Sequence, residues 1–335
     1  MTRIPSLLAL SATLAFTASA EAQQPDPRDY EVAYFVPSNS IVANVYLRHA
    51  SSQDGTAVQQ EIAAFRATYI LKWVNDWGDI AITPFDAIVP VVDATAHIPD
   101  PTGTLPLSYT ARGSGVADIL FLPTIGYGMT QDKATATHTW AALTTYFTIP
   151  VGAYDKTRLV NVGRNRLAIN PLLVVGQRFM KIFTAELMGG LTWYGKNTEI
   201  DVPMLDEDAA LSQKLSYSFM AHLGVDLHPT FFLGASYYLN ANGDQTLELS
   251  KLNVPTPPAD TVTPGTTSHA LRLNMGFRLG RTTVLLAQYH DEIGGTEGAA
   301  RSRFFGLRLS HVFALFTPET ADPAKPAQGP KEVRE

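Results

Sequence analysis

The chain of 335 residues contains no cysteine, which excludes a disulfide framework and a thiolate metal site. Beyond residue 22 it also lacks any run of roughly 18 apolar residues, the length that a membrane-spanning helix needs. Positive charge is scarce: 25 Lys and Arg stand against 31 Asp and Glu, for a formal net charge of −6. This balance argues against nucleic acid as a partner. The 8 histidines show no zinc-site spacing, and we expect no metal and no cofactor.

The first residues have the pattern of a secretory signal. Arg3 precedes an apolar run at 7–16, and Ala18, Ala20 and Ala22 satisfy an A-x-A cleavage rule twice. The run is too short to span a bilayer as a helix. We predict a cleaved signal peptide over residues 1–22, with an uncleaved anchor as the alternative.

In the rest of the chain every second side chain is apolar through a long series of segments. In 215–228 the odd-numbered residues, such as Tyr217 and Leu223, are apolar, and the even-numbered ones include His222 and Asp226. No helical period of 3.6 fits these runs, whereas a strand with one apolar and one polar face does. About twelve such strands can be counted, with boundaries good to a few residues: 38–49, 61–75, 80–92, 115–129, 138–151, 166–178, 181–195, 213–228, 231–246, 268–279, 282–291 and 303–316.

The connections between these segments alternate in length. Even-numbered ones, such as 228–230 and 280–281, are short, and the odd-numbered ones are mostly long loops, among them 94–114, 196–212 and 241–267. Outer-membrane barrels have short periplasmic turns and long external loops. The sequence therefore predicts an all-β fold: a transmembrane antiparallel up-and-down β-barrel in the outer membrane of a Gram-negative bacterium. A soluble β-sandwich is the alternative, but it does not account for the signal, the loop lengths and the polar faces together.

The predicted barrel domain covers residues 23–316, and 317–335 is predicted to be a disordered periplasmic tail because it has four prolines and no aromatic residue. In many barrels the assembly machinery recognises an aromatic residue that ends the last strand. Here Phe316 ends the strand but falls outside its apolar face, so either Leu315 holds the terminal outward position or a bulge shifts the register. We therefore expect the barrel-assembly machinery and outer-membrane lipid as partners.

Aromatic residues near strand ends are expected to form girdles at the lipid headgroups. These residues are Trp73, Trp77, Tyr127, Trp140, Trp193, Tyr194, Phe231 and Phe232.

Three segments carry a family resemblance: GVADILFLP at 115–123, PVGAYD at 150–155, and NVGRN at 161–165 with Asn170-Pro171 after it. In this order they resemble the outer-membrane family of the meta-pathway of phenol degradation, over most of the mature chain. The resemblance implies a barrel related in architecture to the fatty-acid and aromatic-hydrocarbon channels. It also implies passive uptake of small hydrophobic or aromatic solutes. A structural or adhesive outer-membrane barrel with a blocked lumen and no transport is the alternative.

Charges at alternate strand positions should face the lumen, because the lipid-facing surface strongly disfavours charge at mid-depth. They line a narrow aqueous path, or they pair across the lumen and fill it, since twelve strands enclose a modest bore. The predicted lumen-lining residues are Arg66, Lys72, Glu186, His222, Asp226, Arg272, Arg278 and Arg308.

We predict no catalytic residues. A barrel phospholipase needs His and Ser together on the lipid side, and the apolar faces beside His311 show no nucleophile. His290 and Asp291 lie near an outer loop as a protease pair would. Being adjacent on a strand, however, they point to opposite faces.

Overall fold

The computed structural model describes residues 38–52, 57–75, 78–99, 108–132, 137–202, 207–296 and 301–315. The predicted signal peptide, Phe316 and the predicted tail lie outside these residues. Every regular element in the described part of the chain is a strand. No helix in these ranges is long and apolar enough to cross a membrane.

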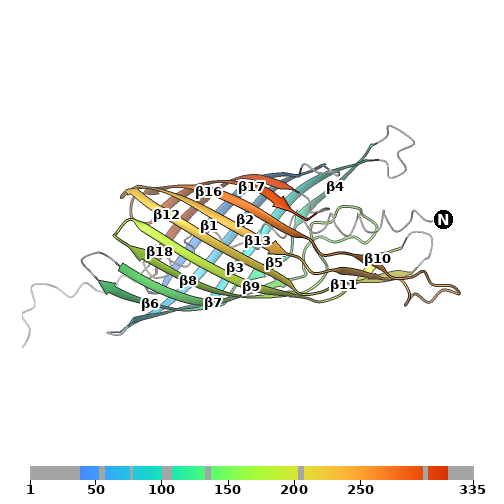
Figure 1. Cartoon of the computed structure of the whole chain (residues 1–335), viewed down its shortest axis with the longest axis horizontal. Helices are drawn as coiled ribbons and strands as arrows, with labels where there is room; N and C mark the ends of the chain where they lie inside the picture. The colour runs from blue at the N-terminus through green and yellow to red at the C-terminus, as the bar shows by residue number, and fades with distance from the viewer. Residues whose placement is uncertain are drawn as a thin grey trace, which may run out of the picture.

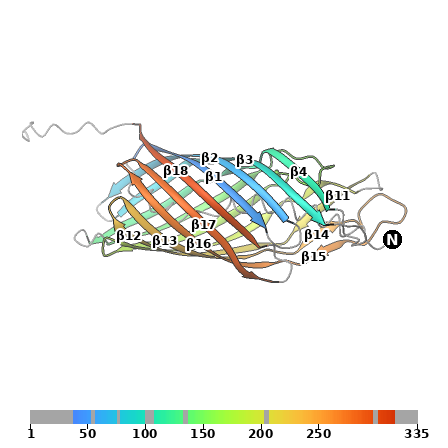
Figure 2. The same cartoon turned by 90° about the horizontal axis from the view of Figure 1, so that it is seen from above.

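Twelve antiparallel strands close into a barrel (Figures 1 and 2), which confirms the predicted fold and strand number. One of the twelve is built from three pieces, β4 (Ser108–Val116), β5 (Ile119–Phe121) and β6 (Thr124–Asp132). Each strand pairs with its neighbours along the chain, and β18 pairs with β1 to close the wall. The other strands are β1 (Ser40–Ser52), β2 (Ala57–Asn75), β3 (Gly78–Pro99), β7 (Thr137–Ile149), β8 (Ala168–Phe179), β9 (Phe183–Tyr194), β12 (Ser216–His228), β13 (Phe231–Ala241), β16 (Thr267–Leu279), β17 (Thr283–Gly295) and β18 (Ser302–Ala314).

The strand register fixes the tilt of the wall. A row of directly paired residues starts at Val74 on β2, passes through His222 and Arg272, and returns to β2 at Gln60, 14 positions away. With strands about 4.8 Å apart and a rise of about 3.3 Å per residue, this shear gives a tilt of roughly 40° and a backbone radius of roughly 12 Å. The tilt lies within the range of membrane barrels.

The outer face of the wall is apolar. Leu223, Leu273 and Phe305 are 66%, 58% and 58% exposed, and large hydrophobic residues occupy equivalent positions on every wall strand. The alternate positions are buried and include many polar side chains. A closed sheet with this two-sided pattern satisfies its backbone hydrogen bonds internally and presents hydrocarbon to lipid, as an outer-membrane barrel must.

The two ends of the barrel differ. Short turns join β8 to β9, β12 to β13 and β16 to β17 at one end. At the other end β3 and β4 continue as a hairpin, and four further strands form a separate sheet (Figure 2). These strands are β10 (Asn197–Asp201), β11 (Asp208–Gln213), β14 (Gln245–Glu248) and β15 (Thr261–Thr263), in the order β10-β11-β14-β15. We call them the external sheet, because long connections in such barrels are external.

The connections 94–114, 196–212 and 241–267 are long, as predicted, but they contain strands that the sequence did not indicate. The external sheet has its own apolar core, in which Val202, Ala209, Leu247, Leu249 and Leu252 pack together. Strands of three to six residues are too short to show an alternating pattern, which is why the sequence did not indicate them.

The prediction of an aromatic girdle is wrong for two of its residues. Trp73 and Trp193 are half exposed, at 51% and 50%, but Trp140 is 1% exposed and Phe232 8%. The cross-strand partner of Trp140 is Gly176, and a glycine likewise faces Phe232. A Cβ on Gly176 would lie only 2.2 Å from the indole, so the ring occupies the space that the missing side chain leaves. Trp77 lies outside the described residues.

Candidate functional site

The inner wall carries the polar side chains from which a solute path could be built. The eight predicted lumen-lining residues all lie on the face opposite the lipid-facing positions, on strands β2, β9, β12, β16 and β18. Five of the eight are buried, with exposed fractions that range from 0% for Arg272 to 8% for Asp226. The side chains of Arg66, Lys72 and Arg278 are 11%, 12% and 28% exposed.

At the turn end, one carboxylate links three strands that are spread over five neighbouring positions of the wall. Asp226 on β12 accepts hydrogen bonds from Arg178 on β8 and Arg278 on β16, the second at 2.8 Å. Each guanidinium also binds a turn carbonyl, Arg178 that of Lys181 and Arg278 that of Pro229. Because these charges are paired and tied to turns, they hold this end of the wall in shape.

On β2 and β3 the inner charges are paired across the strands. Arg66 donates to both oxygens of Asp86, at 2.9 and 2.7 Å, and the Thr68 hydroxyl donates to the same carboxylate at 2.9 Å. Lys72 lies 3.0 Å from Asp79.

A chain of hydrogen bonds crosses the middle of the inner wall on β12, β13, β16 and β17. His222 Nδ1 and the Ser236 hydroxyl are 2.9 Å apart, Asn274 donates to the same hydroxyl at 3.3 Å, and Gln288 donates to Asn274 at 3.0 Å. Glu186 is the direct cross-strand partner of His222. The middle of this wall is therefore lined by polar side chains.

The wall is irregular between β3 and the interrupted strand β4–β5–β6. At one point the extra residue is on β3: its residues 84–86 face only residues 122–123, between β5 and β6. Further along, the extra residue is on the interrupted strand: its residues 117–119 face only residues 89–90 of β3. These are two β-bulges of opposite sense, and they restore the original register beyond them. Pro84 and Pro123 lie in the first bulge, where a proline has no N–H to donate to the neighbouring strand.

A row of aromatic rings lies on the outer side of this irregular stretch. Phe85 on β3 is 52% exposed, its ring centroid is 6.3 Å from that of Phe121 on β5, and Phe121 is 6.5 Å from Phe147 on β7. On the inner side the same stretch carries the buried Asp86 and Asp118. Aromatic surface and polar interior are therefore separated here by a wall with incomplete strand pairing.

Asp118 holds the long connection between β7 and β8 against the wall. Its Oδ1 accepts the backbone N–H of Gly152 at 3.0 Å, and its Oδ2 accepts that of Arg164 at 2.7 Å. The two donors lie near opposite ends of the connection 150–167, which is thereby fastened to the gap between β4 and β5. We call this connection the strap.

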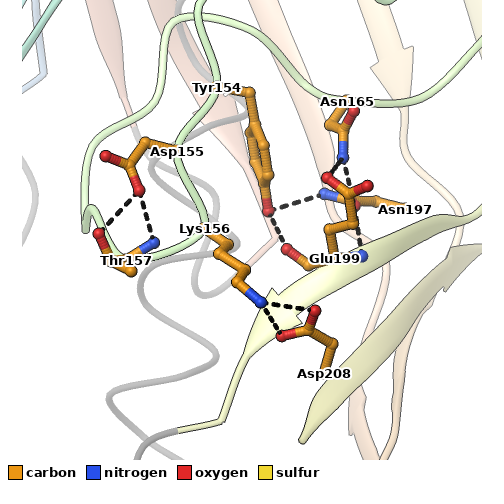
Figure 3. Close-up of polar contacts among 8 residues, drawn as sticks. All are labelled: Tyr154, Asp155, Lys156, Thr157, Asn165, Asn197, Glu199 and Asp208. Carbon is orange, nitrogen blue, oxygen red and sulfur yellow. Dashed lines mark hydrogen bonds and ion pairs between the residues drawn. The ribbon is translucent and has the colours of Figure 1, made fainter.

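A polar network joins the strap to the external sheet (Figure 3). The Tyr154 hydroxyl donates to the Glu199 carbonyl at 2.6 Å and accepts from Asn197 at 3.1 Å. Asn165 binds both Asn197 and the Glu199 side chain, at 3.1 and 2.9 Å. Lys156 bonds both oxygens of Asp208, at 2.9 and 2.8 Å.

The electrostatics of the network favour the arrangement seen. The hydrogen bond to Asp208 raises the pKa of Lys156, so the lysine stays charged. Burial raises the pKa of Tyr154, whose hydroxyl therefore stays protonated and remains a donor. Within the strap itself, bonds from the Thr157 hydroxyl and backbone lower the pKa of Asp155.

Sequence reasoning missed the roles of Tyr154, Asn165 and Asn197. The segments PVGAYD and NVGRN did stand out, but only as carriers of the family resemblance and not as contacts between loops. It also missed a hydroxyl beside His311: Thr283 Oγ1 lies 2.8 Å from the imidazole Nδ1. Among the described residues no cluster of His, Asp and Glu could hold a metal ion.

Comparison with known proteins places these features in a family. The family model described as "Putative MetA-pathway of phenol degradation" matches residues 35–313. Among solved structures, an outer membrane channel from Pseudomonas putida F1 superposes with a TM-score of 0.67 at 17% identity, covering 87% of this chain and all of that one. At that identity it shows a shared fold. The transport unit of the autotransporter AIDA-I from Escherichia coli gives 0.48 at 10% identity over 94% of this chain and all of that one. A mutant of the monoaromatic hydrocarbon channel TodX gives 0.46 at 9% identity over 84% of this chain and 92% of that one. No curated protein matches.

Proposed function

The chain belongs to the phenol-degradation family of outer-membrane proteins, and on this premise we propose that it is a channel for passive uptake of small hydrophobic or aromatic compounds. Such uptake needs no catalytic residue, and we assign the protein no enzymatic activity. The irregular stretch of wall carries the proposal, because a hydrophobic solute can leave a barrel sideways only where strand pairing is incomplete.

The chemistry on the two sides of this stretch supports a lateral route. The outer row of Phe85, Phe121 and Phe147 offers a solute aromatic surface at the boundary with lipid, where apolar compounds partition favourably. The paired inner charges keep the lumen polar, so a solute of low polarity gains free energy by moving outward through the wall. In this proposal the eight predicted inner residues line the polar path that leads to the exit.

The remaining assignments follow from the same function. We propose that residues 1–22 direct export, that residues 23–316 are inserted into lipid by the barrel-assembly machinery, and that 317–335 form a periplasmic tail.

Uptake of radiolabelled toluene or phenol by cells that express the protein tests the proposal. Replacing Phe85 and Phe121 by Gln should lower the initial rate of toluene uptake, because the aromatic surface at the exit is lost. The matched control is Leu273→Gln, which places the same polar group on the lipid-facing side of β16, away from the bulges. Equal uptake by expressing cells and by cells without the protein would refute the function.

The external sheet favours the second candidate, a structural or adhesive barrel with a blocked lumen. Its four strands and separate core build a defined surface beyond the membrane. Conductance in planar bilayers separates the two candidates: a sealed barrel gives no openings at any voltage.

A further inference from the structure

Three ion pairs lie on the outward face of the barrel, near the external ends of six neighbouring strands that run side by side in Figure 2. We call their six residues the charged belt; the pairs are Asp291 on β17 with Arg303 on β18, His49 on β1 with Glu61 on β2, and Asp93 on β3 with Arg112 on β4. Their side chains are between 27% and 69% exposed. The next outward residues toward the turn end are apolar, such as Leu47 at 54% and Phe305 at 58% exposed, so the belt begins where the lipid-facing surface ends.

The charged belt covers only one side of the barrel. With the tilt given above, a row of paired residues climbs about 3 Å toward the external end at each strand. Allowing for this climb, Tyr217 on β12 and Trp193 on β9 lie at the height of the belt on the opposite side of the wall. Both are uncharged, and they are 55% and 50% exposed. A layer of lipid headgroups is level and would favour charges at this height all round the barrel, so a one-sided belt fits a protein neighbour better.

The order of charges along the belt is self-complementary. From β17 to β4 the groups are negative, positive, imidazole, negative, negative and positive. A twofold axis along the membrane normal, between β1 and β2, reverses this order in a second copy. It places Glu61 of the second copy opposite His49, and Asp93 of the second copy opposite Arg303, so that no like charges face each other. Because both walls curve away from the axis, His49 and Glu61 come closest, and Arg303 and Asp93 attract each other across water.

Below the belt, the outward face beside the same axis is flat. Ala43 on β1 is the direct partner of Ala67 on β2, which is in turn the partner of Ala87 on β3. On the other described wall strands, outward alanines are paired with larger residues, as Ala185 is with Leu223. Small side chains let two membrane segments approach closely, as they do between membrane helices. The alanines do not attract a partner, but they allow a second wall to come near enough for the two belts to meet.

We propose that the charged belt is a homodimer interface, through which two copies of this chain pack side by side in the membrane along β18, β1, β2 and β3. The contact is isologous, since both copies contribute the same residues. The charges fix the register and orientation of the two barrels, which the apolar surface below them does not specify. The inference does not depend on the transport function, because a conducting and a sealed barrel present the same outer face.

Crosslinking in outer membranes tests the contact. The chain has no cysteine, so a single introduced cysteine can join only one copy to another. Ser51 lies two residues beyond His49 on the same face of β1, and Ser51→Cys therefore places a thiol beside the proposed axis. A short bifunctional methanethiosulfonate should convert most of this variant to a covalent dimer on denaturing gels. The matched control, Tyr217→Cys, has its thiol at the same height on the opposite side and should stay monomeric. The interface is wrong if Ser51→Cys gives no more dimer than this control.

Exchange of charges between two differently tagged copies tests the pairing itself. One copy carries Glu61→Arg and the other His49→Glu, each together with Ser51→Cys. Within one copy either change breaks only an exposed ion pair, so both variants should fold, which heat-modifiable migration on gels checks. Between copies, the introduced arginine faces the introduced glutamate only in a mixed dimer, whereas two His49→Glu copies bring four carboxylates together. Mixed-tag dimers should therefore exceed their share in a random mixture roughly threefold. A random mixture of folded variants would show that the belt does not form the interface.

Discussion

Removing the Asp118 carboxylate should release the strap from the wall. Asp118 accepts two backbone N–H groups, from Gly152 and Arg164, and its charge also attracts the buried guanidinium of Arg164. A hydrogen bond to a charged acceptor contributes about 1.5–3 kcal/mol. The exposure of the carboxylate to water in the opened state offsets part of this, so Asp118→Ala should destabilise the docked strap by about 3 kcal/mol.

Limited trypsin digestion of the protein in outer-membrane vesicles measures the effect, because the strap carries Lys156 and Arg158 at exposed positions. When opening is fast relative to cleavage, the rate follows the open population. A change of about 3 kcal/mol should therefore raise cleavage at these sites roughly a hundredfold. Asp118→Asn, which retains one acceptor oxygen, should give a smaller increase.

A control in another external loop shows whether the effect is local. Asp260 accepts the backbone N–H of Ser250 at 2.8 Å, so Asp260→Ala should raise cleavage at Lys251 and leave the strap protected. Unchanged cleavage at Lys156 in Asp118→Ala, together with the expected increase at Lys251 in the control, would refute the anchoring role of Asp118.

Three further variants or conditions test the interior and the external sheet. Gly276→Ala would place a Cβ 2.0 Å from the Phe232 ring and should destabilise the barrel by roughly 1–3 kcal/mol, seen as a lower Tm. Asp226→Ala leaves two guanidinium groups without their shared carboxylate and should lower unfolding stability in urea by about 2–4 kcal/mol. Hydrogen bonds from two lysines lower the pKa of Glu248 below its ordinary 4.5, so this stabilisation is present above that value and is lost as the pH falls through the lowered pKa. Amide exchange in the external sheet should therefore accelerate as the pH falls from above 4.5 through the lowered pKa of Glu248, after correction for intrinsic rates.

Much of the fold could be predicted because lipid imposes a rule that every wall strand obeys. Residues 215–228 must present apolar groups at alternate positions, whatever lies above or below them in the barrel, and their burial alternates as predicted. The external sheet obeys no such rule. Leu247 and Leu249 form a core with Val202 from a different connection, and nothing in either segment alone indicates the contact.

The inner-wall site, like the fold, could be predicted only in part. The alternating pattern placed charges such as Asp226 and Arg272 on the inner face, but it could not say that one would bind two arginines and the other would stack on Tyr238. Such contacts depend on the shear of the closed barrel, which the sequence does not state. The bulge at Pro84 did leave a signal, because Pro84 and Phe85 interrupt the alternation and a proline is rare inside a wall strand.

At Pro84, β3 contains one residue more than each of the two strands that pair with it. On the β2 side the register shifts by one between Tyr69 and Leu71, and on the other side 84–86 face only two residues. A one-residue shift normally turns every later side chain to the opposite face. Here, however, Thr83 and Asp86 are both buried and the two residues between them are both exposed, so the bulge absorbs the extra residue locally.

Deleting Pro84 should therefore regularise the wall without reversing any side chain. Thr83, Phe85 and Asp86 would then alternate inward, outward and inward, and the barrel should fold and resist heat at least as well as the wild type. If the incomplete pairing is the exit for hydrophobic solutes, toluene uptake should fall severalfold while single-channel conductance for small ions stays the same. Deletion of Phe305, a lipid-facing residue of the regular strand β18, is the matched control and should disrupt the register and folding. Wild-type toluene uptake by a folded Pro84 deletion would show that solutes do not leave through the bulge.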